Sequence, residues 1–416
     1  MYESMFSCTY TEVLRALRKR LQEPAPARAQ ILSGPRQVGK TTLLGEIAAD
    51  WAGKVIYAPA DAPEASLSGW WENLWGNAER LALRHVAVLL IDEIQNLPDW
   101  SHLLKSKLDH IKLRRIPLHV VVSGSSALQL GHGARETMAG RFERLRLLHW
   151  PASELVKRFR ISAEAGVKQV VRFGGYPGAV ALLADYVRWR AYIKDSIVEP
   201  AIGRDVLVME AIRKPALLRQ VFAVCVGHPA EIISIQKLCG QLRERGALET
   251  VAHYLHVLEE ACLVAAIPKY SLKVVRQRAA PPKLVILNNA LLSVTGAQSP
   301  PQAGRDAERW GRWVENACIA MAWNAGQNPS YWRMEPLEVD MVIDGFWGRW
   351  AVEIKTGSYG TRDLAGIMEF CRRHADFRPL VLCEPGSETV ARQAGIASVA
   401  WPSFLLNGLS PTPEAG

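Results

Sequence analysis

The chain has 416 residues, enough for two or three domains, and its 49% hydrophobic and 22% charged residues are typical of an ordinary globular protein. Its net charge of +9 favours an acidic partner such as nucleic acid, although a basic cytosolic protein without such a partner has the same charge. The odd number of cysteines, the lack of a signal peptide and the lack of a membrane-length apolar run exclude a secreted or membrane-spanning class, so we expect a cytoplasmic protein.

The first strong signal is a phosphate-binding loop. An amphipathic helix over residues 10–21 and a short buried strand over 29–32 precede Gly34–Thr41, which fits the pattern G-x-x-x-x-G-K-[ST] and leads into a further helix. Backbone N–H groups and a helix N-terminus hold phosphates in this context, so we expect Lys40 to reach the β- and γ-phosphates and Thr41 to hold Mg²⁺. The alternative is a chance Gly-rich turn. The predicted nucleotide-binding residues are Gly34, Pro35, Arg36, Gln37, Val38, Gly39, Lys40, Thr41 and Thr42.

An acidic pair follows a buried strand further along the chain. A strand over 54–58 and a Trp-rich helix over 66–82 are expected first, the tryptophans serving core packing rather than base stacking. The apolar run 86–91 then ends in Asp92 and Glu93, at the strand end where open α/β sheets bind ligands. We expect Asp92 to complete the Mg²⁺ shell and Glu93 to orient and deprotonate the attacking water. A helix cap formed by the acidic pair is the alternative.

Two further groups are candidates for contact with the γ-phosphate. The strand expected over 118–126 ends in small hydroxyl residues, and we expect Ser125 or Ser126 to sense the γ-phosphate unless it only caps the next helix. Arg141 precedes a strand expected over 144–148. It is a candidate arginine finger toward a neighbouring subunit's nucleotide, with a solvated arginine as an equal alternative.

These segments together resemble the AAA+ ATPases of archaea and bacteria, specifically the subfamily whose C-terminal part is an uncharacterised nuclease-like domain. The resemblance rests on Gly34–Thr42, Val88–Trp100, Gly124–Ser126 and Gly174–Pro177. It runs through nearly the whole chain and implies an ATPase core to about residue 150, a helical lid at 151–205, ATP and Mg²⁺ as cofactors, and assembly into a ring such as a hexamer. The second sensing arginine is left open among Arg172, Arg188 and Arg204.

A winged helix-turn-helix is expected within residues 206–296. A helix beginning near Ser234, a turn at Gly246, a helix over 248–260 and a strand over 263–267 follow in the order of that motif. The second helix is rich in glutamate, so we expect sequence-independent DNA contact, with a structural spacer as the alternative. The residues expected to neutralise phosphates are Arg245, Lys269, Lys273, Arg276 and Arg278.

The last part of the chain places three carboxylates and a lysine in a recognisable order. Glu315 lies on an expected helix, Asp340 on a strand, and Glu353 and Lys355 on one face of the next strand. This order resembles the PD-(D/E)xK restriction-endonuclease-like fold, in which two carboxylates hold Mg²⁺ and the lysine steadies the attacking water. A solvated, ion-paired strand face is the alternative. Asn288 stands where the family usually has an aspartate, which argues against cleavage.

The predicted fold class is therefore α/β. It comprises a P-loop AAA+ core (1–150), a helical lid (151–205), a winged helix-like domain with a connector (206–296) and a nuclease-like α/β domain (297–416). The expected function is an ATP-hydrolysing motor or switch that binds duplex or branched DNA. One alternative is an ATP-regulated, Mg-dependent endonuclease. The other is a nucleotide-dependent signalling or defence switch that binds a protein partner.

Overall fold

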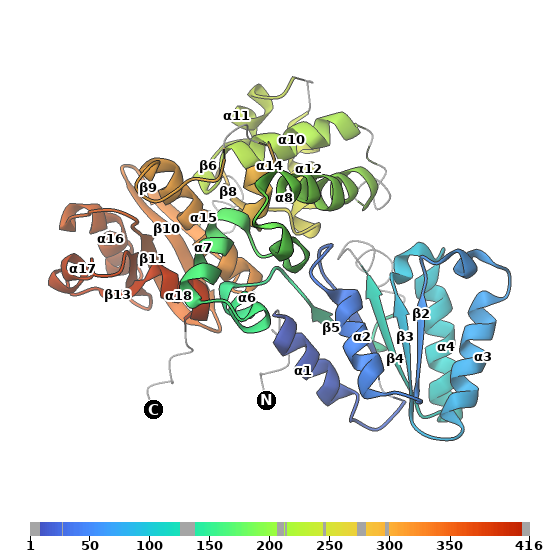
Figure 1. Ribbon diagram of the computed structural model, residues 1–416. Coiled ribbons are helices and arrows are strands. Elements are labelled where there is room, and N and C mark those ends of the chain that lie inside the picture. The colour runs from blue at the N-terminus through green and yellow to red at the C-terminus, as the bar shows by residue number, and fades with distance from the viewer. Residues whose placement is uncertain are drawn as a thin grey trace. The chain divides into compact units, whose positions relative to one another are not determined.

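The computed structural model describes residues 9–409 except 27, 125–137, 206–211, 213, 244–246, 273–279 and 296–298. The chain forms two compact units, Met1–Leu148 and His149–Gly416, which are described one at a time. Figure 1 shows the elements of both units with the labels used below. Within the described ranges, no helix has both the length and the apolar composition needed to cross a membrane.

The first unit is built on a sheet of five parallel strands in the order β2-β3-β4-β1-β5. Every residue of β1, β3 and β4 is buried, as expected for parallel strands covered on both faces. The strands are β1 (Ala29–Ser33), β2 (Val55–Pro59), β3 (Ala87–Asp92), β4 (Leu118–Gly124) and β5 (Phe142–Arg146).

Helices cover both faces of this sheet. Helices α3 and α4 share one hydrophobic core with Ile31, Leu89 and Val122. The opposite face carries Gln30, whose side chain accepts a hydrogen bond of 2.7 Å from Arg20 at the end of α1. The helices of this unit are α1 (Tyr10–Arg20), α2 (Lys40–Asp50), η1 (Pro63–Ser66), α3 (Trp70–Ala82), η2 (Ile94–Asn96) and α4 (Trp100–Arg114).

The strand register decides which residues meet at the carboxyl edge of the sheet. Pro59 pairs with Asp92, and Ser33 pairs with Gly124. Strand β5 begins two residues before the strand expected at 144–148, because Phe142–Arg146 pairs with Ala29–Ser33. The carboxyl ends of β1 to β4 therefore lie along the same side of the sheet, where the loop that follows β1 begins.

The second unit begins with short helices over residues 152–205. Trp189 is fully buried among them, and its ring packs edge-on against Phe173 at 5.2 Å. The side chain of Ser162 caps α7 by accepting a hydrogen bond of 3.1 Å from the Ala165 N–H. The helices are α6 (Ala152–Phe159), α7 (Ala163–Phe173), η3 (Pro177–Leu182), α8 (Tyr186–Tyr192), η4 (Ile193–Val198) and η5 (Ala201–Asp205).

A helical group with a three-stranded antiparallel sheet follows, in the strand order β6-β8-β7. Ser234 caps α11, as its sequence context predicts. On α12, Tyr254 and Leu258 are buried while His253 and His256 are exposed. The elements are α10 (Pro215–Gly227), β6 (Glu231–Ile232), α11 (Ile235–Gly240), α12 (Leu248–Glu260), β7 (Val264–Ile267), β8 (Lys283–Ile286), η6 (Asn289–Leu291) and α14 (Leu292–Thr295).

The C-terminal part contains a five-stranded sheet in the order β13-β12-β11-β10-β9. Strands β9 to β11 are antiparallel, whereas β11 to β13 are parallel, so α16 supplies the crossover between β11 and β12. The elements are α15 (Ala307–Asn324), β9 (Ser330–Met334), β10 (Leu337–Gly345), β11 (Gly348–Ile354), η7 (Thr361–Leu364), α16 (Ala365–Arg373), β12 (Arg378–Cys383), α17 (Thr389–Gln393), β13 (Ala397–Ala400) and α18 (Trp401–Asn407).

Candidate functional site

The loop between β1 and α2 has the backbone shape of a phosphate cradle. Gln37 and Gly39 adopt left-handed conformations with φ of 60° and 96°. Gly39 is the N-cap of α2 and has no side chain to cap the helix, so the first amides of α2 face the loop. The ammonium of Lys40 donates hydrogen bonds to the carbonyl oxygens of Gly34 (3.1 Å) and Pro35 (2.8 Å). The predicted loop and its lysine therefore lie at the carboxyl edge of the parallel sheet.

Asp92 is the centre of the polar contacts at this edge. It is 3% exposed. Its Oδ2 accepts hydrogen bonds from the hydroxyls of Thr41 (2.7 Å) and Tyr57 (2.9 Å). Its Oδ1 accepts one from the backbone N–H of Glu93 (3.1 Å) and one from the hydroxyl of Ser123. Burial raises the pKa of Tyr57, and the hydrogen bond with Asp92 raises it further. Thr41 and Asp92, predicted separately, are thus in direct contact.

Glu93 turns the chain out of β3. Its φ of 52° is left-handed, and its backbone N–H also donates to the Ser123 hydroxyl at 3.2 Å. The half-buried carboxylate accepts a hydrogen bond from the side-chain amide of Gln95. This partner holds the Glu93 side chain at the edge where Thr41 and Asp92 meet.

The other residues predicted around the nucleotide have mixed outcomes. Ser125 and Ser126 lie outside the described residues; the serine that contacts Asp92 is Ser123, at the end of β4, and the sequence reasoning missed it together with Tyr57. Arg141 precedes β5, and its carbonyl oxygen accepts a hydrogen bond from the Ala29 N–H at the start of β1. It therefore lies at the amino-terminal end of β1, whereas the phosphate loop of the same chain follows the carboxyl end. Its guanidinium forms a two-pronged ion pair with Asp109 on α4, with distances of 2.7 and 3.1 Å. Its role as a finger toward another subunit stays a prediction.

Gly34 allows the loop to pass close to the backbone of Leu147. A Cβ at Gly34 would lie 1.9 Å from the Leu147 carbonyl oxygen.

We expect Gly34→Ala to lower the free energy of unfolding by about 2 kcal/mol and to weaken nucleotide binding, because the loop must move. Gly45→Ala on α2 is the matched control: a Cβ there meets nothing within 4 Å. We expect it to stabilise the protein by up to about 1 kcal/mol. Chemical denaturation and titration with a fluorescent ATP analogue measure both effects; equal behaviour of the two variants would contradict this prediction.

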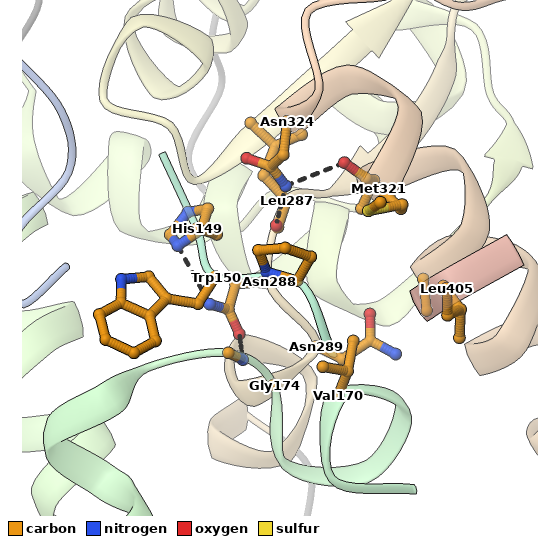
Figure 2. Close-up of a pocket in the computed structure, with 14 residues that line it drawn as sticks. His149, Trp150, Val170, Gly174, Leu287, Asn288, Asn289, Met321, Asn324 and Leu405 are labelled. Carbon is orange, nitrogen blue, oxygen red and sulfur yellow. Dashed lines mark hydrogen bonds between the residues drawn. The ribbon is translucent and has the colours of Figure 1, made fainter. Parts of the chain in front are cut away.

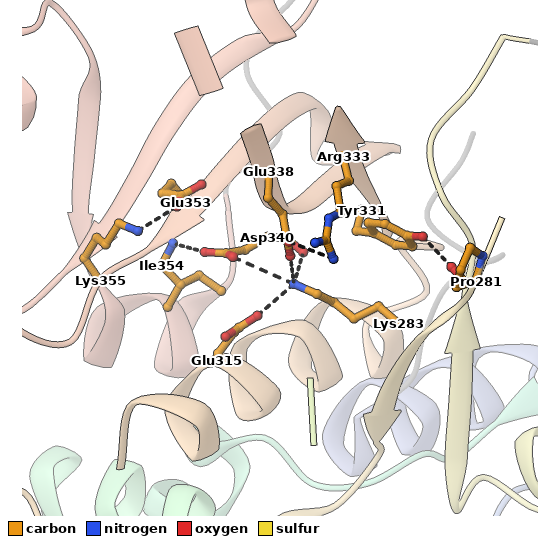
Figure 3. A network of polar contacts seen from close by, with 10 residues as sticks. All are labelled: Pro281, Lys283, Glu315, Tyr331, Arg333, Glu338, Asp340, Glu353, Ile354 and Lys355. Atoms are coloured by element: carbon orange, nitrogen blue, oxygen red, sulfur yellow. Dashed lines mark hydrogen bonds and ion pairs between the residues drawn. The ribbon is translucent and has the colours of Figure 1, made fainter. Parts of the chain in front are cut away.

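The residues predicted for the nuclease-like site also come together. Asp340 Oδ2 accepts a hydrogen bond of 2.8 Å from Ile354 N–H, which ties β10 to the end of β11. Glu353 and Lys355 form an ion pair of 2.7 Å. Burial alone would lower the pKa of Lys355, but Glu353 and Asp340 raise it, so the lysine stays charged. Glu315 reaches the same cluster from α15 (Figure 3).

A residue that the sequence reasoning missed occupies the middle of this cluster. The ammonium of Lys283, on β8, forms ion pairs with Glu315 (2.8 Å), Glu338 (3.3 Å) and Asp340 (3.8 Å). Burial alone would lower the pKa of Lys283, but these carboxylates raise it above its usual value. Among the residues that the structure describes, no group of three His, Cys, Asp or Glu side chains is arranged to hold a metal ion. The cluster in this arrangement does not fit the divalent ion that the nuclease-like resemblance implies.

The residues predicted to contact DNA are mostly beyond the described part of the chain. Lys269 is described: it is half-buried after β7, and its backbone forms a bridge with Tyr331. The structure does not describe the other four predicted residues, Arg245, Lys273, Arg276 and Arg278.

A small cavity in the second unit is lined by polar side chains that hold backbone segments together. It has a volume of about 30 Å³, which offers space to a few water molecules rather than to a cofactor or substrate. His149 and Asn288 line it (Figure 2). The Asn288 amide lies 3.0 Å from His149 Nδ1, and its oxygen accepts hydrogen bonds from Gly175 and Ala290 N–H groups. Asn288, the departure from the family pattern noted in the sequence, therefore joins three segments of the backbone.

Comparison with known proteins bears on the first unit most directly. Residues 26–156 match a family model described as an AAA domain. This part of the chain is thus similar to an AAA domain, in agreement with the predicted P-loop core. Residues 164–301 and 310–404 match two domains of unknown function, DUF8612 and DUF4143. These matches give neither domain an activity.

The curated relatives and solved structures are distant. Uncharacterised proteins Mb2031c of Mycobacterium bovis and Rv2008c of Mycobacterium tuberculosis are each 25% identical over 390 residues, which cover 91% of this chain and 81% of theirs. Among solved structures, AMPPCP-bound DnaA from Aquifex aeolicus is 15% identical with a TM-score of 0.33, over 59% of this chain and 86% of DnaA. Thermotoga maritima RuvB is 20% identical with a TM-score of 0.33, over 62% and 86% of the two chains.

Proposed function

We propose that this protein binds and hydrolyses ATP at the loop Gly34–Thr42, with Mg²⁺ as cofactor. The observation that carries this proposal is the 2.7 Å hydrogen bond between the Thr41 hydroxyl and Asp92 Oδ2, which joins the phosphate loop to the acidic end of β3. A hydroxyl and a carboxylate are oxygen ligands of the kind that Mg²⁺ accepts, so Thr41 and Asp92 fit this ion. When bound, the ion would neutralise charge on the β- and γ-phosphates.

The remaining residues of the site divide the other tasks. Lys40 exchanges its two carbonyl partners for phosphate oxygens, a stronger charge-assisted interaction. Glu93 orients and deprotonates the attacking water, with its carboxylate positioned by Gln95. Ser125 senses the γ-phosphate. Arg141 of a neighbouring copy, released from Asp109, stabilises the charge of the transition state, which requires assembly into a ring such as a hexamer.

We also propose that the nucleotide state controls binding to DNA. The order α10, β6, α11, α12, β7, β8, with β8 between β6 and β7, supports a winged helix-turn-helix. The exposed side of α12 carries His253 and His256 beside acidic residues, so this helix is poorly suited to base readout and we assign it no sequence preference. The net charge of +9 has the sign that a polyanionic partner requires.

For the C-terminal domain we propose a restriction-endonuclease-like fold but no reaction. Helix α15, the antiparallel strands β9 to β11, helix α16 and the parallel strand β12 follow the order of a restriction-endonuclease-like core. Asp340 lies on β10 and Glu353 on β11, whereas Lys355, expected on the same strand as Glu353, directly follows the end of β11. Because Lys283 occupies the space among the carboxylates, we assign no cleavage step to this domain.

ATPase rates and electrophoretic mobility shifts test the proposal together. The full chain should shift duplex or branched DNA at low salt. If all five predicted basic residues contact phosphates, its affinity should fall roughly 500-fold between about 50 and 200 mM salt. DNA should change the rate of ATP hydrolysis, and Lys40→Ala should abolish hydrolysis. No shift at low salt would contradict DNA binding and leave the ATPase proposal standing.

Two outcomes would favour the other functions. Slow ATP turnover that no DNA changes, with a stable protein complex, would favour a switch that binds a protein partner. Nicking that requires Mg²⁺ or Mn²⁺, survives Lys40→Ala and is lost in Asp340→Ala would favour an ATP-regulated endonuclease.

A further inference from the structure

Lys283 is a charged side chain in an unusually buried position. It begins β8 and is only 1% exposed. Its backbone belongs to the small antiparallel sheet, where Lys283 pairs with Ile232 of β6 and Ile267 of β7. Its side chain leaves this sheet and ends among the carboxylates of α15 and β10 (Figure 3). A lysine is almost never buried to this extent unless its charge is paired.

The ammonium lies among oxygen atoms of α15 and β10. It donates to Glu315 Oε1 at 2.8 Å and to the carbonyl oxygen of Asp340 at 3.2 Å, and it lies 3.3 Å from Glu338 Oε1. An ammonium has three N–H donors; two of them donate in these hydrogen bonds, and the Glu338 carboxylate adds an ion pair. The Asp340 carboxylate lies 3.8 Å away and adds a further negative charge.

A second observation concerns Glu353, whose carboxyl group is only partly paired. Glu353 is 7% exposed, and its Oε1 pairs with Lys355 at 2.7 Å. Its Oε2 is buried, and the described residues give it no hydrogen-bond partner. A buried carboxylate oxygen without a partner is costly, and a cation in the cluster would relieve that cost.

We propose that Lys283 is the resident cation of this cluster and excludes a divalent metal ion from Glu315, Asp340 and Glu353. A metal ion bound by Glu315 and Asp340 would lie within a few ångströms of the ammonium, and two positive charges at that separation repel strongly in a buried site. The metal ion and Lys283 therefore compete for the same oxygens. Lys283 also connects β8 to β10 of the C-terminal sheet, so its ion pairs hold the carboxylates in their present positions.

Titration of the full, nucleotide-free chain with Mn²⁺ tests this inference without relying on ATP hydrolysis or DNA binding. After treatment with EDTA, Lys283→Met should bind one Mn²⁺ by calorimetry, and saturating Mn²⁺ should raise its melting temperature by roughly 4 °C. The wild type should show neither effect. Lys168→Met removes an exposed charge on α7, outside the cluster, and should behave as the wild type does. The double variant Lys283→Met/Asp340→Asn should lose the new site.

The outcomes separate clearly. A Mn²⁺ site in the wild type that is lost in Asp340→Asn would overturn the proposal, because Lys283 would then not exclude the ion. Folded Lys283→Met without Mn²⁺ binding would also overturn it. If Lys283→Met does not fold, the comparison of the wild type with Asp340→Asn decides: equal, absent Mn²⁺ binding in both supports exclusion by Lys283.

Discussion

Glu93→Gln is expected to bind ATP with an affinity close to that of the wild type and to hydrolyse it roughly 10²- to 10⁴-fold more slowly, the range that a general base contributes. Glutamine has the size of glutamate, and its side-chain oxygen can still accept the hydrogen bond from Gln95. The amide cannot take a proton from water at neutral pH. Single-turnover phosphate release measures hydrolysis, and titration with a fluorescent ATP analogue measures binding.

Glu72→Gln provides a matched control for this change. Glu72 is an exposed glutamate at the start of α3, paired with Lys107. Its substitution removes one surface ion pair and should leave both measurements within a factor of about two, since exposed pairs contribute little. Hydrolysis by Glu93→Gln within a few-fold of the wild-type rate would show that another group activates the water. A loss of ATP binding would show instead that the variant disturbs the phosphate loop.

The geometry of the candidate nucleotide site could be predicted from the sequence largely because its signals are local. The glycine spacing of Gly34–Thr41 specifies the loop, and the apolar run before Asp92 specifies a buried strand, so both features follow from adjacent residues. Tyr57 and Ser123 were missed because their contacts with Asp92 depend on the alignment of β2, β3 and β4. That register is a property of the sheet, and no short motif specifies it.

The C-terminal cluster shows the same division between local and long-range information. Asp340 and Glu353 belong to one hairpin, in which Met341 pairs with Val352, so their sequence separation was enough to bring them together. Lys283 comes from a different sheet and lies 57 positions before Asp340. A lysine ahead of an apolar run is typical of an exposed strand start. Only the folded arrangement of the carboxylates explains its burial.

The unfolding free energy is expected to fall as the pH drops from about 6.5 to 4 because of His149. Burial lowers the pKa of this imidazole from its ordinary 6.5 to about 4. Its Nε2 lies 2.9 Å from the carbonyl oxygen of Cys262, so Nε2 carries the proton and Nδ1 accepts from the Asn288 amide. The folded state thus needs neutral His149. Below pH 6.5 the unfolded chain binds the proton more readily than the folded chain does. The resulting decrease in the free energy of unfolding reaches about 3 kcal/mol at acid pH.

Comparison with His149→Gln isolates this contribution from those of other groups. Burial raises the pKa of Glu315 and Glu353, and their protonation in the folded state favours folding as the pH falls, which opposes the effect of His149. Both proteins share these carboxylates, so the difference between their unfolding free energies reports His149 alone. The stability advantage of the wild type over His149→Gln should shrink by about 3 kcal/mol between pH 7.5 and acid pH in chemical denaturation. A difference that stays constant with pH would mean that His149 binds its proton equally well in the folded and unfolded chain.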